Sequence, residues 1–184
     1  MISKFSNWLL RQANGLIILI LIALLVVFNR FLFPYFIVHF GPGEGMPLLD
    51  TLFGFRPDQA NYLLSSYGEA GRQGYITTIA VIDSLYPFVY GGLMAFSMSW
   101  TLKMTGFHGT SLQKLNLLPV TAMIFDFVEN AGILGLLKLF PHKATALAGF
   151  TSIMGMAKWV LVFLSILIII GLSVWGLISS LKRK

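Results

Sequence analysis

Apolar residues in this chain fall into four long segments, separated by polar or glycine-rich breaks. The segments cover about residues 16–36, 76–102, 117–140 and 146–181. A membrane-spanning helix needs about 20 mainly apolar residues, and each segment is long enough. The pattern therefore predicts an all-α membrane protein, a four-helix transmembrane bundle that forms a single domain over residues 1–184.

Composition supports a membrane protein and excludes several kinds of site. Hydrophobic residues make up 57% of the chain and charged residues 11%, and the mean hydropathy is +0.81. Without cysteine there is no disulfide or thiolate metal site. The three histidines are far apart, so we expect no metal and no cofactor. The net charge of +6 comes from basic residues beside the apolar segments, and we expect no nucleic-acid partner.

The basic residues also predict the orientation in the membrane. With the N-terminus inside, one side carries only basic residues, namely Lys4, Arg11, Lys103, Lys114, Lys182, Arg183 and Lys184. The other side carries both signs, from Arg56, Arg72, Lys138, Lys143, Glu44, Asp50, Asp58 and Glu69. By the positive-inside rule, we predict a multi-pass plasma (inner) membrane protein with both termini cytoplasmic. The N-terminal segment lacks a small-residue cleavage site, so we interpret it as an uncleaved first span.

The connection between the first two spans, about residues 41–74, is long for a helix bundle. Pro57 is typical of a first helical position, and Gly68 of a helix end. An apolar turn is expected before Gly54. We predict an outer loop of short helices that covers the bundle as a lid. A loop that only shields the helix ends is the alternative.

Several charged residues lie inside the predicted spans. Asp126, Glu129 and Asn130 have helical spacing and project from one face. Charges at the bilayer centre cost about 2.5–3.5 kcal/mol each, so they should face the bundle interior and pair. Counting helix rise places Asp126 and Glu129 at about 14 and 18 Å from the inner boundary.

The same count places Arg30, Asp83 and Lys158 in an outer layer, at about 25 Å. We expect Asp83 to pair with Arg30 or Lys158. One of Asp126 and Glu129 is expected to hold a proton, as an acid or base would. The candidate catalytic residues are Asp126, Glu129 and Asp83, and the candidate ligand-binding residues are Arg30, Lys158, Asn130, Tyr86 and Tyr90. There are two alternatives. The polar groups could serve only as interhelical contacts, and the side chains of Arg30 and Lys158 could extend to the membrane interface.

Three motifs carry a resemblance to known proteins. They are Asp83-x-x-Tyr86-Pro87-x-x-Tyr90 in the second span, Asp126-x-x-Glu129-Asn130 in the third and Lys158 in the fourth. Together they resemble a group of uncharacterised four-span bacterial membrane proteins, and the similarity extends to Leu49-Asp50 and the connection from Phe53 to Arg72. The resemblance implies a shared site without naming an activity. Two acids in a small four-span protein also resemble lipoprotein signal peptidases, whose Asn- and Gly-rich motifs are absent here.

Three functions fit these features, and the sequence leaves open whether the protein is an enzyme. The first is an outward-facing intramembrane acidic pocket that binds or processes a lipid or amphiphilic small molecule. The second is a proton- or ion-coupled transporter or channel, which would act as a homo-oligomer. The third is a non-catalytic subunit of a membrane complex, with its charges paired to a partner's helices.

Overall fold

A computed structural model describes residues 2–43 and 45–182. Glu44, Arg183 and Lys184, which the charge pattern assigned to the two membrane sides, lie outside the described residues. Within the described part, every regular element is helical. The elements are α1 (Ile2–Gln12), α2 (Gly15–Val27), η1 (Phe28–Leu32), α3 (Phe33–Phe40), η2 (Leu49–Thr51), α4 (Pro57–Ser66), α5 (Gly68–Thr78), η3 (Ile79–Asp83), α6 (Tyr86–Thr105), η4 (Ser111–Leu117), α7 (Leu118–Leu139) and α8 (Thr145–Leu181).

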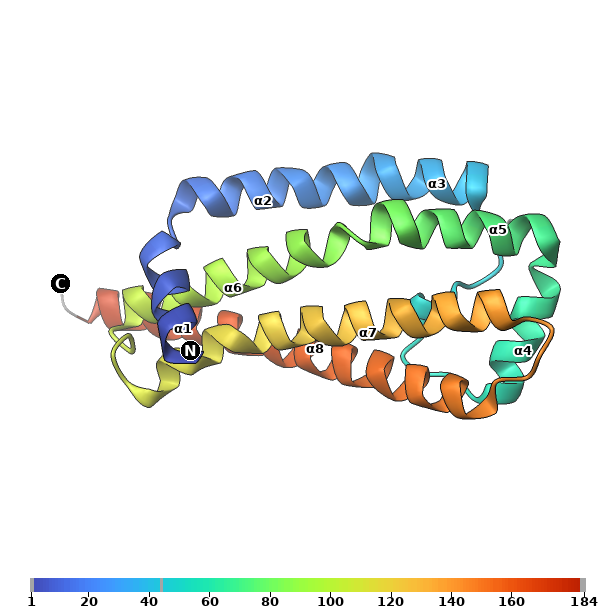
Figure 1. Cartoon of the computed structure of the whole chain (residues 1–184). Coiled ribbons are helices and arrows are strands. Elements are labelled where there is room, and N and C mark those ends of the chain that lie inside the picture. Colours follow the sequence, from blue (N-terminus) through green and yellow to red (C-terminus); the bar gives the residue numbers. More distant parts are fainter. Residues whose placement is uncertain (1, 44, 183–184) are drawn as a thin grey trace.

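Four continuous helical stretches are long and apolar enough to cross a membrane, and they lie lengthwise beside one another (Figure 1). They are Gly15–Phe40, Gly68–Thr105, Ser111–Leu139 and Thr145–Leu181. The predicted all-α four-helix bundle is therefore confirmed, and the chain is a multi-pass membrane protein. The second helical stretch begins at Gly68, so residues 68–74, which the sequence assigned to the outer loop, are helical. These residues are too polar to be recognised as part of an apolar segment.

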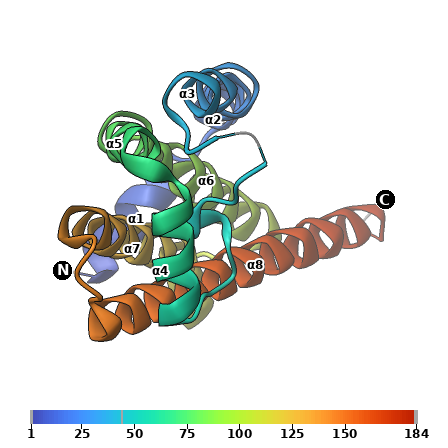
Figure 2. The same cartoon turned by 90° about the vertical axis from the view of Figure 1, so that its right-hand side faces the viewer.

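The first and second stretches are interrupted by π-helical turns, η1 and η3, and the fourth stretch is oblique (Figure 2). The first contains the π-helical turn η1, which ends one residue before α3 and two before Pro34, whose ring removes a backbone donor. The fourth is a single helix of 37 residues, α8. Viewed along the bundle, α8 runs diagonally and diverges from α2 and α3 (Figure 2). This divergence leaves room between α2–α3 and α8.

Helices α7 and α8 approach each other closely because glycines lie at their contact. A Cβ atom at Gly132 would lie 2.1 Å from Thr151 Oγ1, and one at Gly155 would lie 2.2 Å from Glu129 Oε1. Small residues allow such contacts between membrane helices, where apolar surface alone gives little net attraction. The contact at Gly155 also makes space for the Glu129 side chain, so the helix packing and the polar site depend on each other.

The connection between the first two spans folds onto the bundle end. Leu49 and Leu64 are buried in one apolar cluster with the ends of α5 and α7. Tyr67 Oη donates to Pro47 O at 2.7 Å, and burial, followed by the charge of Asp50, raises the pKa of this phenol. Pro57 begins α4 as predicted, and Gly68, with φ of +65°, separates α4 from α5. The ordered connection places the η2 turn against the interior.

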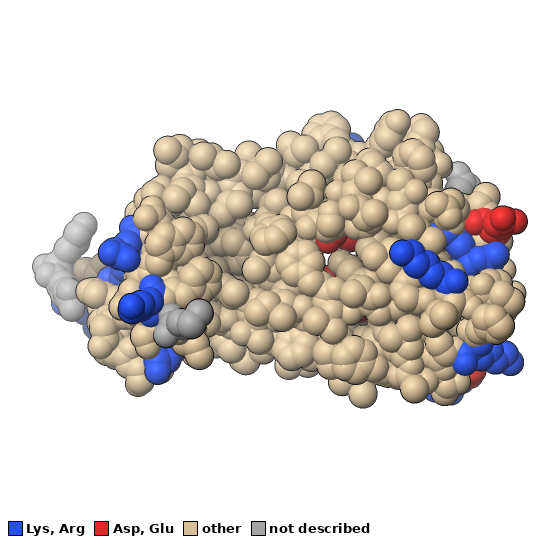
Figure 3. All heavy atoms as spheres, in the orientation of Figure 1, with Lys and Arg blue, Asp and Glu red and all other residues tan. Residues whose placement is uncertain are grey.

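Charged residues gather at the two ends of the molecule, with a mainly uncharged surface between them (Figure 3). At the end formed by α1, the α6–α7 turn and the end of α8, the described charged residues are all basic. Helix α1 was not predicted; it lies across this end of the bundle (Figure 1). Its Ser6 joins Ser99 and Asn116 in a buried hydrogen-bond network.

We expect Asn116→Ala to destabilise the fold by about 1–2 kcal/mol, because buried polar partners would lose their hydrogen bonds. Asn116 Nδ2 donates to Ser6 O at 3.1 Å and to Ser99 Oγ at 3.0 Å, and Oδ1 accepts from Ser6 Oγ at 2.8 Å. Unfolding of the detergent-solubilised protein by denaturant measures the change. Gln12→Ala, at an exposed position at the end of α1, should stay within about 0.5 kcal/mol of the wild type. Equal stability of the two variants would contradict the network.

Candidate functional site

A cavity of about 610 Å³ lies inside the bundle, within the 300–1,000 Å³ typical of ligand pockets. Helices α2 and α3 line one side and α8 the other; α6, α7 and the η2 turn complete it. Its polar residues lie toward the η2 turn. Its other end is lined by apolar side chains, among them Leu93, Met94 and Val162. The cavity is therefore amphipathic, with a polar end and an apolar end.

Lys158 is the central cation of the polar end. Its Nζ lies 2.6 Å from Glu129 Oε2 and 3.7 Å from Asp126 Oδ1, and it donates to Asp50 O at 3.1 Å. Lys158 is only 6% exposed, and Glu129 only 1%. In so little water, removing either partner would leave an unpaired buried charge. The first half of α8, packed on α7, is what brings this lysine to the two carboxylates.

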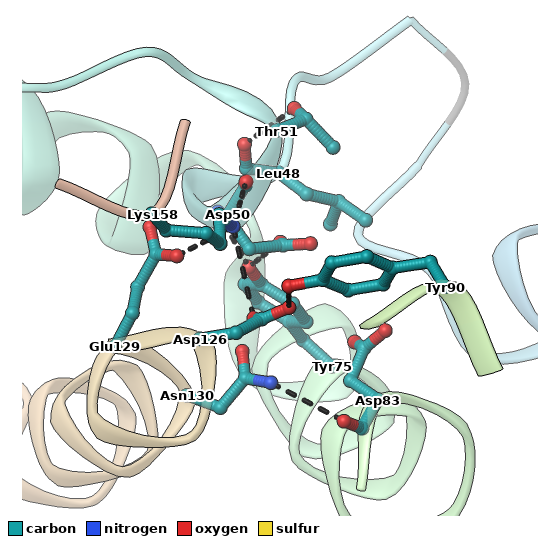
Figure 4. Close-up of polar contacts among 10 residues, drawn as sticks. All are labelled: Leu48, Asp50, Thr51, Tyr75, Asp83, Tyr90, Asp126, Glu129, Asn130 and Lys158. Atoms are coloured by element: carbon teal, nitrogen blue, oxygen red, sulfur yellow. Dashed lines mark hydrogen bonds and ion pairs between the residues drawn. The ribbon is translucent and has the colours of Figure 1, made fainter. Parts of the chain in front are cut away.

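Asp126 connects this ion pair to the cavity wall. Its Oδ2 accepts a hydrogen bond from Tyr90 Oη at 2.7 Å, while its Oδ1 faces Lys158 (Figure 4). Asp126 and Glu129 lie one turn apart on α7, as their spacing predicted. Tyr90 comes from α6, so one carboxyl group joins three helices.

Asp50 reaches the site from the folded connection. The η2 turn carries it into the cavity wall, where its carboxylate accepts a hydrogen bond from Tyr75 Oη, and its backbone carbonyl binds Lys158 (Figure 4). From the sequence, Asp50 was expected in the outer loop and not in the site. The apolar residues around it, Leu48, Leu49 and Leu52, were the signal that this turn is buried.

Asp83 and Asn130 lie beside the cavity from η3 and α7. Asn130 Nδ2 donates to the Asp83 backbone carbonyl at 3.3 Å, and Asn130 Oδ1 is buried without a hydrogen bond. Asp83 is 6% exposed and lines the cavity. Among the described residues, its carboxyl group has no hydrogen bond and no ion pair within 4.0 Å. It is thus a buried acceptor that faces the cavity without a protein partner.

The expected pairing of Asp83 with Arg30 or Lys158 is wrong. Lys158 pairs with the two acids of α7 instead, because α7 and α8 are the closest helices in the bundle. Arg30 is exposed on η1 and does not line the cavity. The predicted separation into an outer layer and a deeper acidic layer fails for Lys158, whose long side chain contacts both deeper acids.

The structure brings most of the predicted residues together. Those that line the cavity are Asp83, Tyr86, Tyr90, Asp126, Asn130 and Lys158. Glu129 lies behind Lys158, and Arg30 lies elsewhere. The residues missed include Asp50 and Tyr75, and also Asn29, Thr51 and Trp159 of the cavity lining. Within the part of the chain that the structure describes, no group of three or more His, Cys, Asp or Glu side chains is placed to hold a metal ion.

The face shown in Figure 3 has a small hollow in which acidic atoms are visible, over the region between α5–α6 and α7 in Figure 1. The side of the cavity between α2–α3 and α8 faces away from the viewer in Figure 3 and is seen in Figure 2. Helices α2 and α3 pack on α5 and α6, whereas α8 packs on α6 and α7; extensive packing between α2–α3 and α8 is absent from the described part. The two sides of the cavity are therefore not closed against each other.

Comparison with protein-family models, with curated proteins and with solved structures finds no match. The resemblance to the four-span bacterial group stays a prediction, and function must be inferred from the site itself.

Proposed function

We propose that this protein binds a membrane amphiphile in the cavity between α2–α3 and α8. The observation that carries the proposal is the amphipathic lining of one cavity at the level of the membrane spans. The charged cluster around Lys158 lies at one end, and apolar side chains such as Leu93 and Val162 line the other. A soluble polar ligand would place no apolar group against the apolar end of the cavity, whereas an amphiphile matches both ends.

The arrangement of the helices supports entry from the lipid. Helix α2 is almost wholly exposed, and the second half of α8 is exposed on most of its surface, so both face the hydrocarbon. Because these two helices do not pack extensively on each other, an acyl or alkyl chain can pass between them while the polar head moves along the cavity. Entry from the bilayer avoids passing the chain through water, where its exposure would be unfavourable.

The polar end also provides groups for proton exchange with a bound head group. Asp83 and Asp126 line the cavity, and Tyr90 donates a hydrogen bond to Asp126. A carboxyl group within hydrogen-bond reach of a ligand can act as a general acid or base. We propose this role for Asp126 and Asp83, with Lys158 and Glu129 as the pair that positions Asp126.

The charge distribution supports an orientation for this site. The α1 end, whose described charged residues are all basic, is proposed to be cytoplasmic, in a plasma (inner) membrane. The η2 turn and α4 would then lie at the outer surface, and the polar end of the cavity would face outward. Labelling of single cysteines introduced at Lys4 and Glu69, with a reagent that does not cross membranes, tests this orientation.

The binding proposal predicts that a tryptophan at Val162 prevents ligand retention. Val162 lines the apolar end of the cavity, so an indole ring there occupies the space of the chain. The full-length protein is purified in maltoside detergent, and its bound lipids are identified by mass spectrometry. We expect a defined amphiphile at near-stoichiometric amount in the wild type and a several-fold reduction in Val162→Trp.

The matched control is Phe163→Trp, one residue further along α8, where the side chain is 54% exposed on the outside of the bundle. This variant should retain the ligand at the wild-type level. Equal retention by Val162→Trp and Phe163→Trp, or a wild-type protein with only detergent bound, would contradict the proposed function.

A further inference from the structure

The charge of the cavity is strongly unbalanced. Asp50, Asp83 and Asp126 line it, whereas Lys158 is the sole lysine or arginine among the described lining residues. Glu129 adds a fourth carboxyl group directly behind Lys158. Buried charges are tolerated when they are paired, so an excess of acids calls for a partner from outside the chain or for bound protons.

The charge of Lys158 is already paired within the protein. Its Nζ lies 2.6 Å from Glu129 Oε2 and 3.7 Å from Asp126 Oδ1, and it donates to Asp50 O, so two carboxylates and a carbonyl group already surround it. Its Nζ also lies 5.2 Å from the ring centroid of Trp159. Arg30, the other cation considered for anion binding, is outside the cavity. A phosphate or carboxylate head would therefore meet carboxylates without a free cation.

The charged group of the cavity that has no partner among the described residues is an acid instead. The Asp83 side chain, 6% exposed, has no hydrogen bond or ion pair within the described residues and faces the cavity. The single polar hydrogens of Tyr90 Oη and Thr51 Oγ1 are already donated, to Asp126 and to Leu48 O. The unpaired charged side chain of this wall is an acid, so a cationic group of a ligand matches it. Trp159 Nε1, buried without a partner in the described part of the chain, and Tyr86 Oη, which accepts from Asn29, leave donors for an uncharged polar group of the same ligand.

Aromatic rings line the same cavity as the free carboxyl group. Tyr86 and Tyr90 of α6 follow Asp83 of η3 in the sequence, their ring centroids are 5.4 Å apart, and all three residues line the cavity. Carboxylates combined with aromatic faces are the usual surroundings of bound ammonium groups.

We infer that the amphiphile bound in this cavity carries a cationic ammonium head group, held by the Asp83 carboxylate and the rings of Tyr86 and Tyr90. The inference rests on the proposed function and adds the charge of the ligand. It replaces the expectation that a basic residue holds an anionic head. Bringing one ammonium to Asp83 pairs this acid and reduces the excess of carboxyl groups in the cavity by one.

The test compares three probes with the same twelve-carbon chain: dodecylammonium, dodecyl phosphate and dodecanol. Each is titrated into the purified full-length protein in maltoside detergent near neutral pH, and the rise in thermal unfolding temperature gives the apparent affinity. We expect saturable stabilisation by dodecylammonium, and weaker stabilisation by the other two. Tighter or equal binding of dodecyl phosphate overturns the inference while leaving amphiphile binding in place; no binding of any probe overturns the proposed function as well.

Two variants assign the effect to the site. Asp83→Asn should weaken dodecylammonium binding about tenfold or more, the loss expected for one charge-assisted contact, and should leave dodecanol binding unchanged. Asp58→Asn makes the same change in net charge at an exposed position and should bind like the wild type. If Asp83→Asn does not fold, Tyr86→Leu serves instead and should also weaken dodecylammonium selectively. Unchanged dodecylammonium affinity in Asp83→Asn, or in Tyr86→Leu when it replaces that variant, overturns the assignment.

Discussion

Replacing Lys158 with methionine is expected to destabilise the folded protein by about 3–5 kcal/mol, the cost of breaking a buried ion pair by removing one partner. Glu129, 1% exposed, and Asp126, 7% exposed, would lose the cation that both contact. Methionine is close to lysine in length, so the change removes charge with little change in packing. Thermal and denaturant unfolding in detergent measure the loss, and poor recovery of folded protein would accompany it.

Two further variants separate the ion pair from other effects of the substitution. Lys143→Met removes one positive charge at an exposed position and should leave stability nearly unchanged. Lys158→Met combined with Glu129→Gln removes one of the two carboxylates left without their cation and should recover part of the loss, because a neutral amide costs less to bury than an ion. A Lys158→Met protein as stable as Lys143→Met would show that the pair is not formed.

Gly132→Leu is expected to have the second large effect, a destabilisation of about 3 kcal/mol. Even the Cβ atom would lie 2.1 Å from Thr151 Oγ1 and 3.0 Å from Thr151 Cβ, so the α8 backbone must move away. Thr151 is fully buried and leaves no free space for a longer side chain. Separation of α7 from α8 would also pull Lys158 from Glu129, so site and fold should be affected together.

Gly171→Leu is the matched control for this change. It makes the same substitution in α8, at an exposed position where a Cβ atom meets nothing within 4 Å. Stability should be unchanged or slightly increased, since leucine favours helix over glycine. Comparison of the two variants by unfolding in detergent gives the packing effect alone. If Gly132→Leu were as stable as Gly171→Leu, α7 and α8 would not be in contact at Gly132.

The directions of the Lys158 and Arg30 side chains could not be predicted from the sequence pattern. Counting helix rise predicts how deep each ionisable residue lies in the membrane. It does not predict the direction in which the side chain points. It placed Lys158 level with Asp83 and could not tell that the lysine side chain is directed to α7. Arg30 has the same predicted depth and faces outward, because the rotation of α2 and η1 about their axis depends on packing against α6.

Asp50 shows a different limit. It lies 108 residues from Lys158 in sequence, yet its backbone carbonyl binds that side chain. By hydropathy, the short η2 turn that carries Asp50 belongs to the loop. In the structure, the burial of Leu49 and the hydrogen bond from Tyr75 bring this turn into the site. A connection of this kind is positioned by many weak contacts from distant elements, and no local pattern encodes their sum.

What the sequence by itself determined are the properties that depend on neighbours along the chain. The lengths of the apolar segments set the number of spans, because backbone groups in lipid must be satisfied within a helix. Helical spacing put Asp126, Glu129 and Asn130 on one face. Only the tertiary structure decided which cation meets those acids, which acid stays unpaired and which loop residue joins them. These outcomes follow from helix rotation, tilt and close contact at glycines, which are set by packing in three dimensions.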